Sequence, residues 1–214
     1  SNTIGTSDYL SCISYLNEKY RSWFGESRQF SPKQLVHKHN LNEDTSIDLN
    51  SLYTYVKNSE SLIKDRPGKP TINGYQTYEV LKGSTNQTVK ILCEKIISLA
   101  TDYYDTLELP YKMGNGNNRY EISGWGVALN GGGHQKLHTH PEAKISGVLY
   151  LKTSKETESM ETDKGNILFP TVESLSIAPY TGLMIIFPSY LPHSTVPTTE
   201  AVSYTHLTLP TMLW

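Results

Sequence analysis

The fold of this chain is decided by residues 119–152, which read RYEISGWGVALNGGGHQKLHTHPEAKISGVLYLK. Two stretches rich in β-branched, aliphatic and aromatic residues, 119–129 and 144–152, flank a run of glycines and a histidine-rich segment. Runs of this kind, bounded by turn-forming residues, are typical of short β-strands. The stretch therefore predicts two strands, with a turn at 130–133 and a His-x-His segment between them.

The same pattern continues further along the chain. Short apolar runs at 166–169, 174–178 and 182–187 are separated by breaks that contain glycine, proline and polar residues. Many short strands with such spacing favour a sandwich or barrel over a parallel α/β sheet. We expect residues 111–200 to form a β-barrel core.

Residues 1–110 have a mainly helical pattern. Apolar residues recur at helical spacing from Tyr9 to Phe24 and from Val89 to Leu99, and further short helices are expected between these stretches. We expect the helices to pack on one sheet of the barrel. The predicted fold class is α+β, mainly β, and a length of 214 residues suits a single domain.

Composition limits the classes of partner and location. A formal net charge of −2 provides no basic surface for nucleic acid or for anionic lipid. The sequence has no signal-peptide pattern and no apolar stretch close to about 20 residues, so we expect no membrane span. The two cysteines, Cys12 and Cys93, lack metal-ligand spacing. Buried free thiols and a cytoplasmic location are therefore expected.

A mononuclear metal site is indicated by His138, His140 and the distant His193. Residues two apart in a strand point to the same side, so His138 and His140 can direct two imidazoles at one point. His193 follows an apolar strand that ends at prolines, where it can complete one face of a metal ion and leave other positions open. The alternative is a solvated pair in a glycine-rich loop. His134 could also replace one member of the pair.

A second His-x-His pair, His37 and His39, lies in a polar stretch that we expect at the second helix or its end. A solvated face is the better interpretation there. We assign these two residues no role.

Residues 138–141, 145–151 and 182–194 together resemble the 2-oxoglutarate- and iron(II)-dependent oxygenases related to the prolyl hydroxylases. The resemblance covers roughly residues 120–197. It implies a double-stranded β-helix of the jelly-roll or cupin-like type, with Fe(II) as the metal and 2-oxoglutarate as the co-substrate. His140 then stands where the family usually has a carboxylate, which leaves the site with one more unit of positive charge.

The resemblance also implies roles for single residues. His138 and His193 are expected to be iron ligands. Tyr150 follows the histidine pair much as a co-substrate-binding tyrosine does, and could donate its hydroxyl to the distal carboxylate of 2-oxoglutarate. A core aromatic with a satisfied hydroxyl is an equally good interpretation of Tyr150. The weaker candidates for co-substrate contacts are Ser146 and Asn130, and for Asn130 a turn residue is the simpler interpretation.

The chain departs from this family after His193. The family expects an Arg or Lys about ten residues later, on the next strand, where it pairs with the co-substrate carboxylate. No Lys or Arg follows Lys164, and residues 202–210 resemble a translated cloning adaptor. We expect 201–214 to be an atypical, non-native tail, so that the last strand and its cation are lost and 2-oxoglutarate binds poorly.

The function expected from these features is a 2-oxoglutarate- and Fe(II)-dependent dioxygenase that hydroxylates a small-molecule or peptide substrate of unknown identity. A cupin-like metal enzyme that does not use 2-oxoglutarate is a second interpretation, because Gly132 and Gly182 precede the two histidine motifs at partly cupin-like distances. A non-catalytic metal-binding module is a third. The fold does not identify the substrate, and the helical half could carry the contacts of a homodimer.

Overall fold

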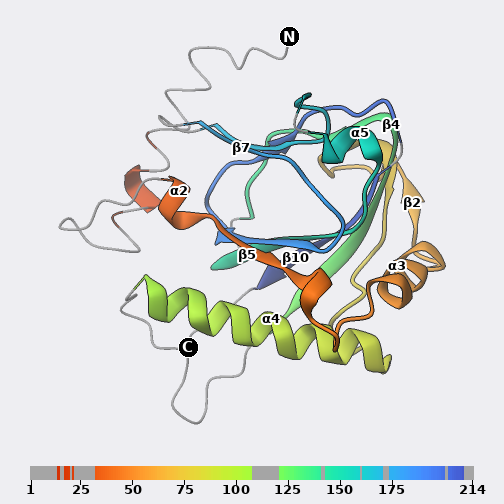
Figure 1. The fold of residues 1–214 in the computed structure, drawn as a ribbon, viewed down its shortest axis with the longest axis horizontal. Coiled ribbons are helices and arrows are strands. Elements are labelled where there is room, and N and C mark those ends of the chain that lie inside the picture. The colour runs from red at the N-terminus through yellow and green to blue at the C-terminus, as the bar shows by residue number, and fades with distance from the viewer. Residues whose placement is uncertain are drawn as a thin grey trace.

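The computed structural model describes residues 32–107, 121–140, 143–159, 161–170 and 174–200, the backbone of 202–209, and a few residues between 14 and 21. In these ranges the strands form two antiparallel sheets. One has seven strands in the order β1-β8-β5-β10-β4-β3-β2, and the other has three in the order β7-β6-β9. Figure 1 shows β7 across from β5 and β10, with helix α4 along the opposite side of the larger sheet. The mainly β, α+β fold class is confirmed.

The larger sheet consists of β1 (His37–Asn40), β2 (Ile63–Lys64), β3 (Thr71–Gln76), β4 (Ser123–Gln135), β5 (Ile145–Lys152), β8 (Leu183–Pro188) and β10 (Val202–Leu209). The smaller sheet consists of β6 (Ile167–Phe169), β7 (Leu175–Ile177) and β9 (Ser194–Thr195). Four of these strands, β5, β6, β7 and β8, lie within two residues of the boundaries that the apolar runs predict. Their sequences form strands because β-branched and aliphatic residues fit a pleated surface that is covered on both faces.

The helices are α2 (Pro32–Leu35), α3 (Leu49–Lys57), α4 (Gln87–Thr106) and α5 (Lys155–Glu158), with a 3-10 helix at Leu41–Glu43. The predicted helix from Val89 to Leu99 lies inside α4. Asn86 caps the N-terminus of α4, because its side chain accepts hydrogen bonds from the backbone N–H groups of Thr88 and Val89 at 2.9 and 3.2 Å. The helix predicted from Tyr9 to Phe24 lies almost entirely outside the described residues.

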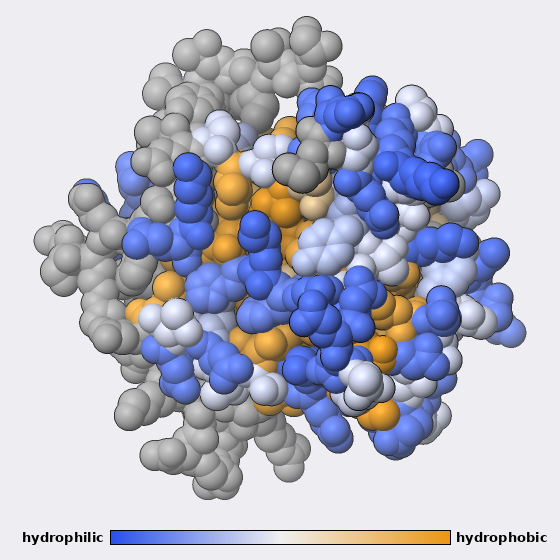
Figure 2. Space-filling model, viewed as in Figure 1, coloured by the Kyte–Doolittle hydropathy of each residue, from blue (hydrophilic) through white to orange (hydrophobic). Residues whose placement is uncertain are grey.

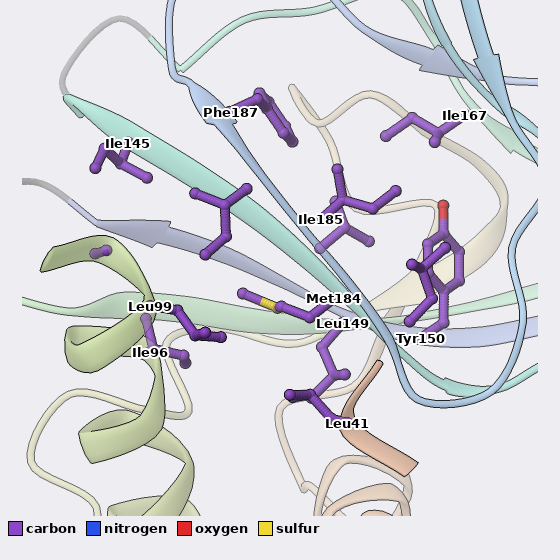
Figure 3. Close-up of a cluster of buried hydrophobic side chains, with 14 of the residues drawn as sticks. Leu41, Ile96, Leu99, Ile145, Leu149, Tyr150, Ile167, Met184, Ile185 and Phe187 are labelled. Carbon is purple, nitrogen blue, oxygen red and sulfur yellow. The ribbon is translucent and has the colours of Figure 1, made fainter. Parts of the chain in front are cut away.

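The hydrophobic core lies on both faces of β5 and β8, and all six residues of β8 are buried. Figure 3 shows Leu149 and Met184 on the side of Leu99 in α4, whereas Tyr150 points towards Ile167 of the smaller sheet. Full burial of such an aliphatic side chain is worth about 1.5–3 kcal/mol. The two layers therefore hold β5 and β8 in fixed positions, and these strands lead to the histidine segment.

Strand β4 continues through the glycines, so the turn predicted at 130–133 is wrong. Gly132 has a φ of +81°, in the left-handed region that glycine adopts without strain. A Cβ on Gly131 would lie 2.2 Å from the carbonyl oxygen of Thr199. The register between β3 and β4 also shifts between Ile72 and Gly74. The glycines therefore let the strand bulge where the sequence suggests that it ends.

The first 110 residues also contribute strands that the sequence does not predict. His37 and His39 lie in β1, at the edge of the larger sheet, instead of at the end of a helix. Strand β2 forms where the sequence indicates another short helix, and Ile63 belongs to it. The N-terminal part is therefore built into the same sheet as the C-terminal strands.

Residues 202–209 form β10, whose backbone lies between β4 and β5. Tyr204, for example, is paired with Val127 on one side and with Tyr150 on the other. The expectation that the last strand is lost is therefore wrong. A sheet position between two strands can be filled by any chain that supplies backbone N–H and C=O groups, because the ladder does not depend on side-chain identity.

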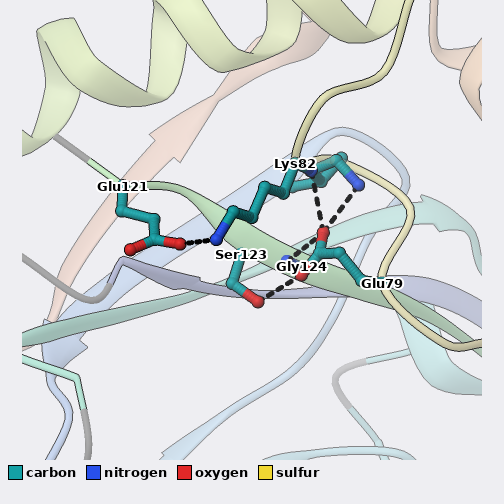
Figure 4. A network of polar contacts seen from close by, with 6 residues as sticks. Glu79, Lys82, Glu121, Ser123 and Gly124 are labelled. Carbon is teal, nitrogen blue, oxygen red and sulfur yellow. Dashed lines mark hydrogen bonds and ion pairs between the residues drawn. The ribbon is translucent and has the colours of Figure 1, made fainter.

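The connection between β3 and α4 is fixed on β4 by Glu79 (Figure 4). The Glu79 carboxylate accepts hydrogen bonds from the backbone N–H groups of Lys82 and Gly124, each at 2.9 Å. Lys82 in turn forms an ion pair with Glu121. These contacts anchor the start of β4, the strand that leads to the histidine segment.

The face of the molecule drawn in Figure 2 is largely hydrophilic, with smaller hydrophobic patches between the polar residues. Among the helices that the structure describes, none has the length and apolar character needed to cross a membrane.

Candidate metal centre

The structure brings His138, His140 and His193 together. One ring nitrogen from each of them lies within 4.8 Å of the other two. The ring centroids of His138 and His193 are 4.2 Å apart, and His140 lies 5.0 and 5.1 Å from these two rings. Among the described residues, this is the single group of three or more potential metal ligands.

The backbone holds the three histidines in this arrangement. His138 and His193 form an antiparallel bridge in which each N–H donates to the carbonyl oxygen of the other at 3.0 Å. The N–H of His140 donates to the carbonyl oxygen of Ser189 at 2.9 Å. The segment after β4 and the segment between β8 and β9 are therefore joined at both histidine motifs. These hydrogen bonds fix the backbone from which the three imidazoles project.

Hydrogen bonds to carbonyl groups set the tautomers of two of the rings. The Nδ1 of His138 lies 2.7 Å from the carbonyl oxygen of Lys136, and the Nδ1 of His193 lies 3.0 Å from that of Leu191. A carbonyl oxygen can only accept, so each Nδ1 must carry the proton and donate it. The lone pair of each ring is then on Nε2, the nitrogen available to a metal ion.

Burial favours the neutral form of His138 and His140. Burial lowers the pKa of His138. Burial, followed by the positive charges of His138 and Lys69, lowers the pKa of His140 to about 3. A neutral imidazole is the form that binds a metal ion, so little proton competition is expected near pH 7. Lys69 is exposed, and sequence reasoning gave no signal that it acts on this site.

Aromatic side chains surround the histidine group. Phe187 packs edge-on against His193 with ring centroids 4.7 Å apart, and Phe169 lies 6.0 Å from the same ring. Trp125 lies 5.6 Å from His140. His193 is only 1% exposed. An apolar surround of this kind limits access of water and lowers the local dielectric constant.

The two predicted co-substrate residues on β5 lie within the core. Tyr150 is 1% exposed, and burial raises the pKa of its phenol, so the hydroxyl is a donor at all ordinary pH values. Ser146 is fully buried, and its hydroxyl lies 2.7 Å from the hydroxyl of Ser189. Because the Ser189 carbonyl oxygen accepts from His140, Ser146 is connected to the histidine group through one residue. Sequence reasoning missed Ser189, although it directly follows the proline that ends β8.

Asn130 and His134 lie on β4, outside the histidine group. The side-chain amide of Asn130 donates to Oδ1 of Asn73 at 3.5 Å. His134 is paired with Ile72 of β3 and does not belong to the group of ligands. The structure therefore supports His140 over His134 as the third member.

Residues 123–204 match the sequence model of the family described as "Putative 2OG-Fe(II) oxygenase". This match covers the strands and the three histidines that form the site. No curated protein sequence matches the chain.

Several solved structures have the same fold. A Pseudomonas putida prolyl-4-hydroxylase is 12% identical, with 84% of this chain and 94% of that chain covered and a TM-score of 0.58. A viral collagen prolyl hydroxylase from Paramecium Bursaria Chlorella virus-1, in a 2-oxoglutarate complex, is 15% identical, with 82% and 95% covered and a TM-score of 0.59. A prolyl hydroxylase from Trichoplax adhaerens, bound to a peptide fragment, is 12% identical, with 98% and 94% covered and a TM-score of 0.58.

Proposed function

We propose that the protein is an Fe(II)- and 2-oxoglutarate-dependent oxygenase whose metal is held by His138, His140 and His193. Residues 123–204, which contain all three histidines, match the sequence model of the family described as "Putative 2OG-Fe(II) oxygenase". The observation that carries this proposal is the convergence of three imidazole nitrogens within 4.8 Å in an aromatic surround. The order of the strands supports it. With β4, β5, β8 and β10 in one antiparallel sheet and β6, β7 and β9 in the other, we propose that the core is a double-stranded β-helix.

The residues of the site fit the metal. Neutral imidazoles suit Fe(II) as well as Zn, Cu and Ni, and three ligands on one face leave positions for a co-substrate. Bound Fe(II) and 2-oxoglutarate together activate O₂ for the hydroxylation of a C–H bond. The protein supplies the ligand geometry through the His138–His193 bridge and a dry surround through Phe187 and Trp125.

Tyr150 is the proposed donor to the distal carboxylate of 2-oxoglutarate. Its hydroxyl points into the space between the two sheets, towards Ile167 (Figure 3). Its raised pKa keeps the proton on the phenol, which a donor to a carboxylate requires. Ser146 is a second candidate contact, and Asn130 is the weakest of the three because its amide is already bonded to Asn73.

The absence of Lys and Arg after Lys164 supports one other function. A dianionic co-substrate would have no Lys or Arg on β10 to pair with, so a metal-binding module that does not use 2-oxoglutarate is the second candidate. The third imidazole in place of a carboxylate adds one unit of positive charge at the metal, and this charge partly offsets the loss. The substrate is proposed to be a small molecule or a peptide.

The test is to load the protein anaerobically with Fe(II), titrate it with 2-oxoglutarate and follow the visible charge-transfer band. We expect a band in the parent protein and in His134→Ala, and no band in His193→Ala. Stoichiometric Fe(II) without a band would favour the metal-binding module. A parent protein that binds no Fe(II) would contradict the proposed site.

A further inference from the structure

Thr195 connects the two sheets beside the proposed metal site. Its backbone belongs to β9, where it is paired with Ile167 of β6 in the smaller sheet. Its hydroxyl oxygen accepts a hydrogen bond from the backbone N–H of Gln135 at 2.9 Å, and Gln135 is the last residue of β4 in the larger sheet. Because the Thr195 backbone is used by β6, the hydroxyl takes the place of a backbone acceptor for β4.

This contact closes a small loop of backbone that contains two of the histidines. Gln135 lies three residues before His138, and Thr195 lies two residues after His193. The His138–His193 backbone bridge joins the two segments at one end, and the Gln135–Thr195 hydrogen bond joins them at the other. The two histidine-bearing segments are thus fastened at two points, which fixes their angle as well as their distance.

The surroundings leave Gln135 no evident replacement for this acceptor. Gln135 is 2% exposed and Thr195 is 8% exposed, so water has little access. The side-chain amide of Gln135 donates to the hydroxyl of Thr71 at 2.7 Å, and that hydroxyl donates to Oε1 of Gln76 at 2.9 Å. Loss of the Thr195 hydroxyl would leave a buried N–H without an acceptor, and the segment would have to move to recover one.

We propose that Thr195 is a positioning residue of the metal site: its hydroxyl holds the end of β4 against β9 and thereby sets the geometry between His138 and His193. This inference rests on the proposed function, since it concerns the same metal. The shell around a metal site commonly changes metal affinity 10- to 100-fold when it is altered. Thr195 acts one step further out, through the backbone that carries the ligands.

The test uses Co(II) as the probe and measures its binding by the 214-residue chain and the visible absorption spectrum of the complex. Thr195→Val keeps the shape and the strand propensity but removes the acceptor. We expect its Kd for Co(II) to rise about 10-fold and its absorption bands to change in position or intensity. Thr195→Ser, which restores the hydroxyl, is expected to recover both the Kd and the spectrum.

The matched control is Thr157→Val. Thr157 is fully buried, and its hydroxyl donates to the carbonyl oxygen of Ser154 at 2.9 Å in helix α5. This variant loses a buried hydroxyl whose hydrogen bonds are with Ser154 and not with Gln135 or Thr195, so the Kd for Co(II) should not change even if the melting temperature falls. The inference about Thr195 would be overturned if Thr195→Val had the Kd and spectrum of the parent, or if Thr157→Val lost as much Co(II) affinity as Thr195→Val. Either result would leave the proposed function standing. A parent protein that binds no Co(II) would contradict the proposed function, and this inference with it.

Discussion

The chain contains the pattern His-x-His twice, and the two pairs have different structures. His37 and His39 lie on the edge strand β1, and His138 and His140 lie in the segment that follows β4. In both pairs burial lowers the pKa of the imidazoles. The spacing and the direction of the pKa shift are therefore shared, and neither of them distinguishes a metal site from a structural pair.

A third imidazole and the tautomers distinguish the pairs. His193 reaches the second pair from a distant segment, whereas no third ligand joins the β1 pair among the residues that the structure describes. The Nδ1 of His138 donates to the carbonyl oxygen of Lys136, which leaves Nε2 for a metal ion. In His37 the carbonyl oxygen of Gln34 lies 3.1 Å from Nε2, so Nε2 must be the donor and the lone pair is on Nδ1, close to the backbone. The comparison shows that i, i+2 spacing gives a shared side and no more.

The largest expected effect separates the two pairs by metal affinity. His140→Ala removes one of three ligands, and we expect the Kd for Fe(II) or Co(II) to rise by more than about 100-fold, beyond the effect of changes in the surrounding shell. His39→Ala removes a histidine of the same spacing and should leave the Kd within about 2-fold of the parent. Anaerobic metal titration followed by absorption measures both.

A third variant sharpens this comparison. His140→Asp restores the ligand set of two histidines and one carboxylate, so we expect it to retain Fe(II) where His140→Ala does not. It also removes one unit of positive charge from the loaded site, which should weaken binding of the 2-oxoglutarate dianion. Equal loss of metal in His39→Ala and His140→Ala would show that the two pairs do not differ in the way proposed here.

The sequence was sufficient to predict that His138, His140 and His193 converge, and the structure brings them together. That they bind a metal ion stays a prediction. The sequence was sufficient to predict strands β5 and β8 as well, since a long apolar run has to be buried and these runs fit a strand that is covered on both faces. It could not predict β1, because a polar stretch becomes a strand there through pairing with β8. Such pairing depends on the tertiary structure, and local propensity does not contain it.

The side-chain hydrogen bonds around the site could not be predicted from the sequence either. The Thr195–Gln135 and Ser146–Ser189 contacts join residues that are 60 and 43 positions apart. A hydroxyl residue gives no local signal of which distant partner it will meet. The glycines of 130–133 were misread because a bulge and a turn use the same residues.

The next largest effect concerns pH and stability. The pKa of His140 is about 3 in the folded protein and about 6.5 when the chain is unfolded. Between these values the unfolded chain binds a proton that the folded chain does not. The free energy of unfolding of the metal-free protein should therefore fall as the pH falls below about 6.5, by about 1.4 kcal/mol per pH unit for this group.

Urea unfolding of the metal-free protein at several pH values between 6.5 and 4.5 measures this slope. His140→Asn removes the titrating group and should flatten the slope. His39→Asn should flatten it less, because the His39 side chain is only half-buried and its pKa is lowered by a smaller degree of burial. If the two variants have equal slopes, the burial of His140 has less effect on its pKa than we infer.

The smallest expected effect tests whether the β1 pair is structural. His37 packs edge-on against Tyr103 of α4, with ring centroids 4.7 Å apart, and Tyr103 in turn donates to the carbonyl oxygen of Leu35. His37→Ala loses this ring contact, and we expect the free energy of unfolding to fall by about 1 kcal/mol at pH 7, within the range for an aromatic pair. His37→Phe keeps a ring against Tyr103 and should recover part of the loss. The Kd for Co(II) should be unchanged in both variants, since the pair contacts helix α4 and not the metal group. A raised Kd without a change in stability would instead make β1 a part of the metal site. The contrast between the two histidine pairs would then no longer hold.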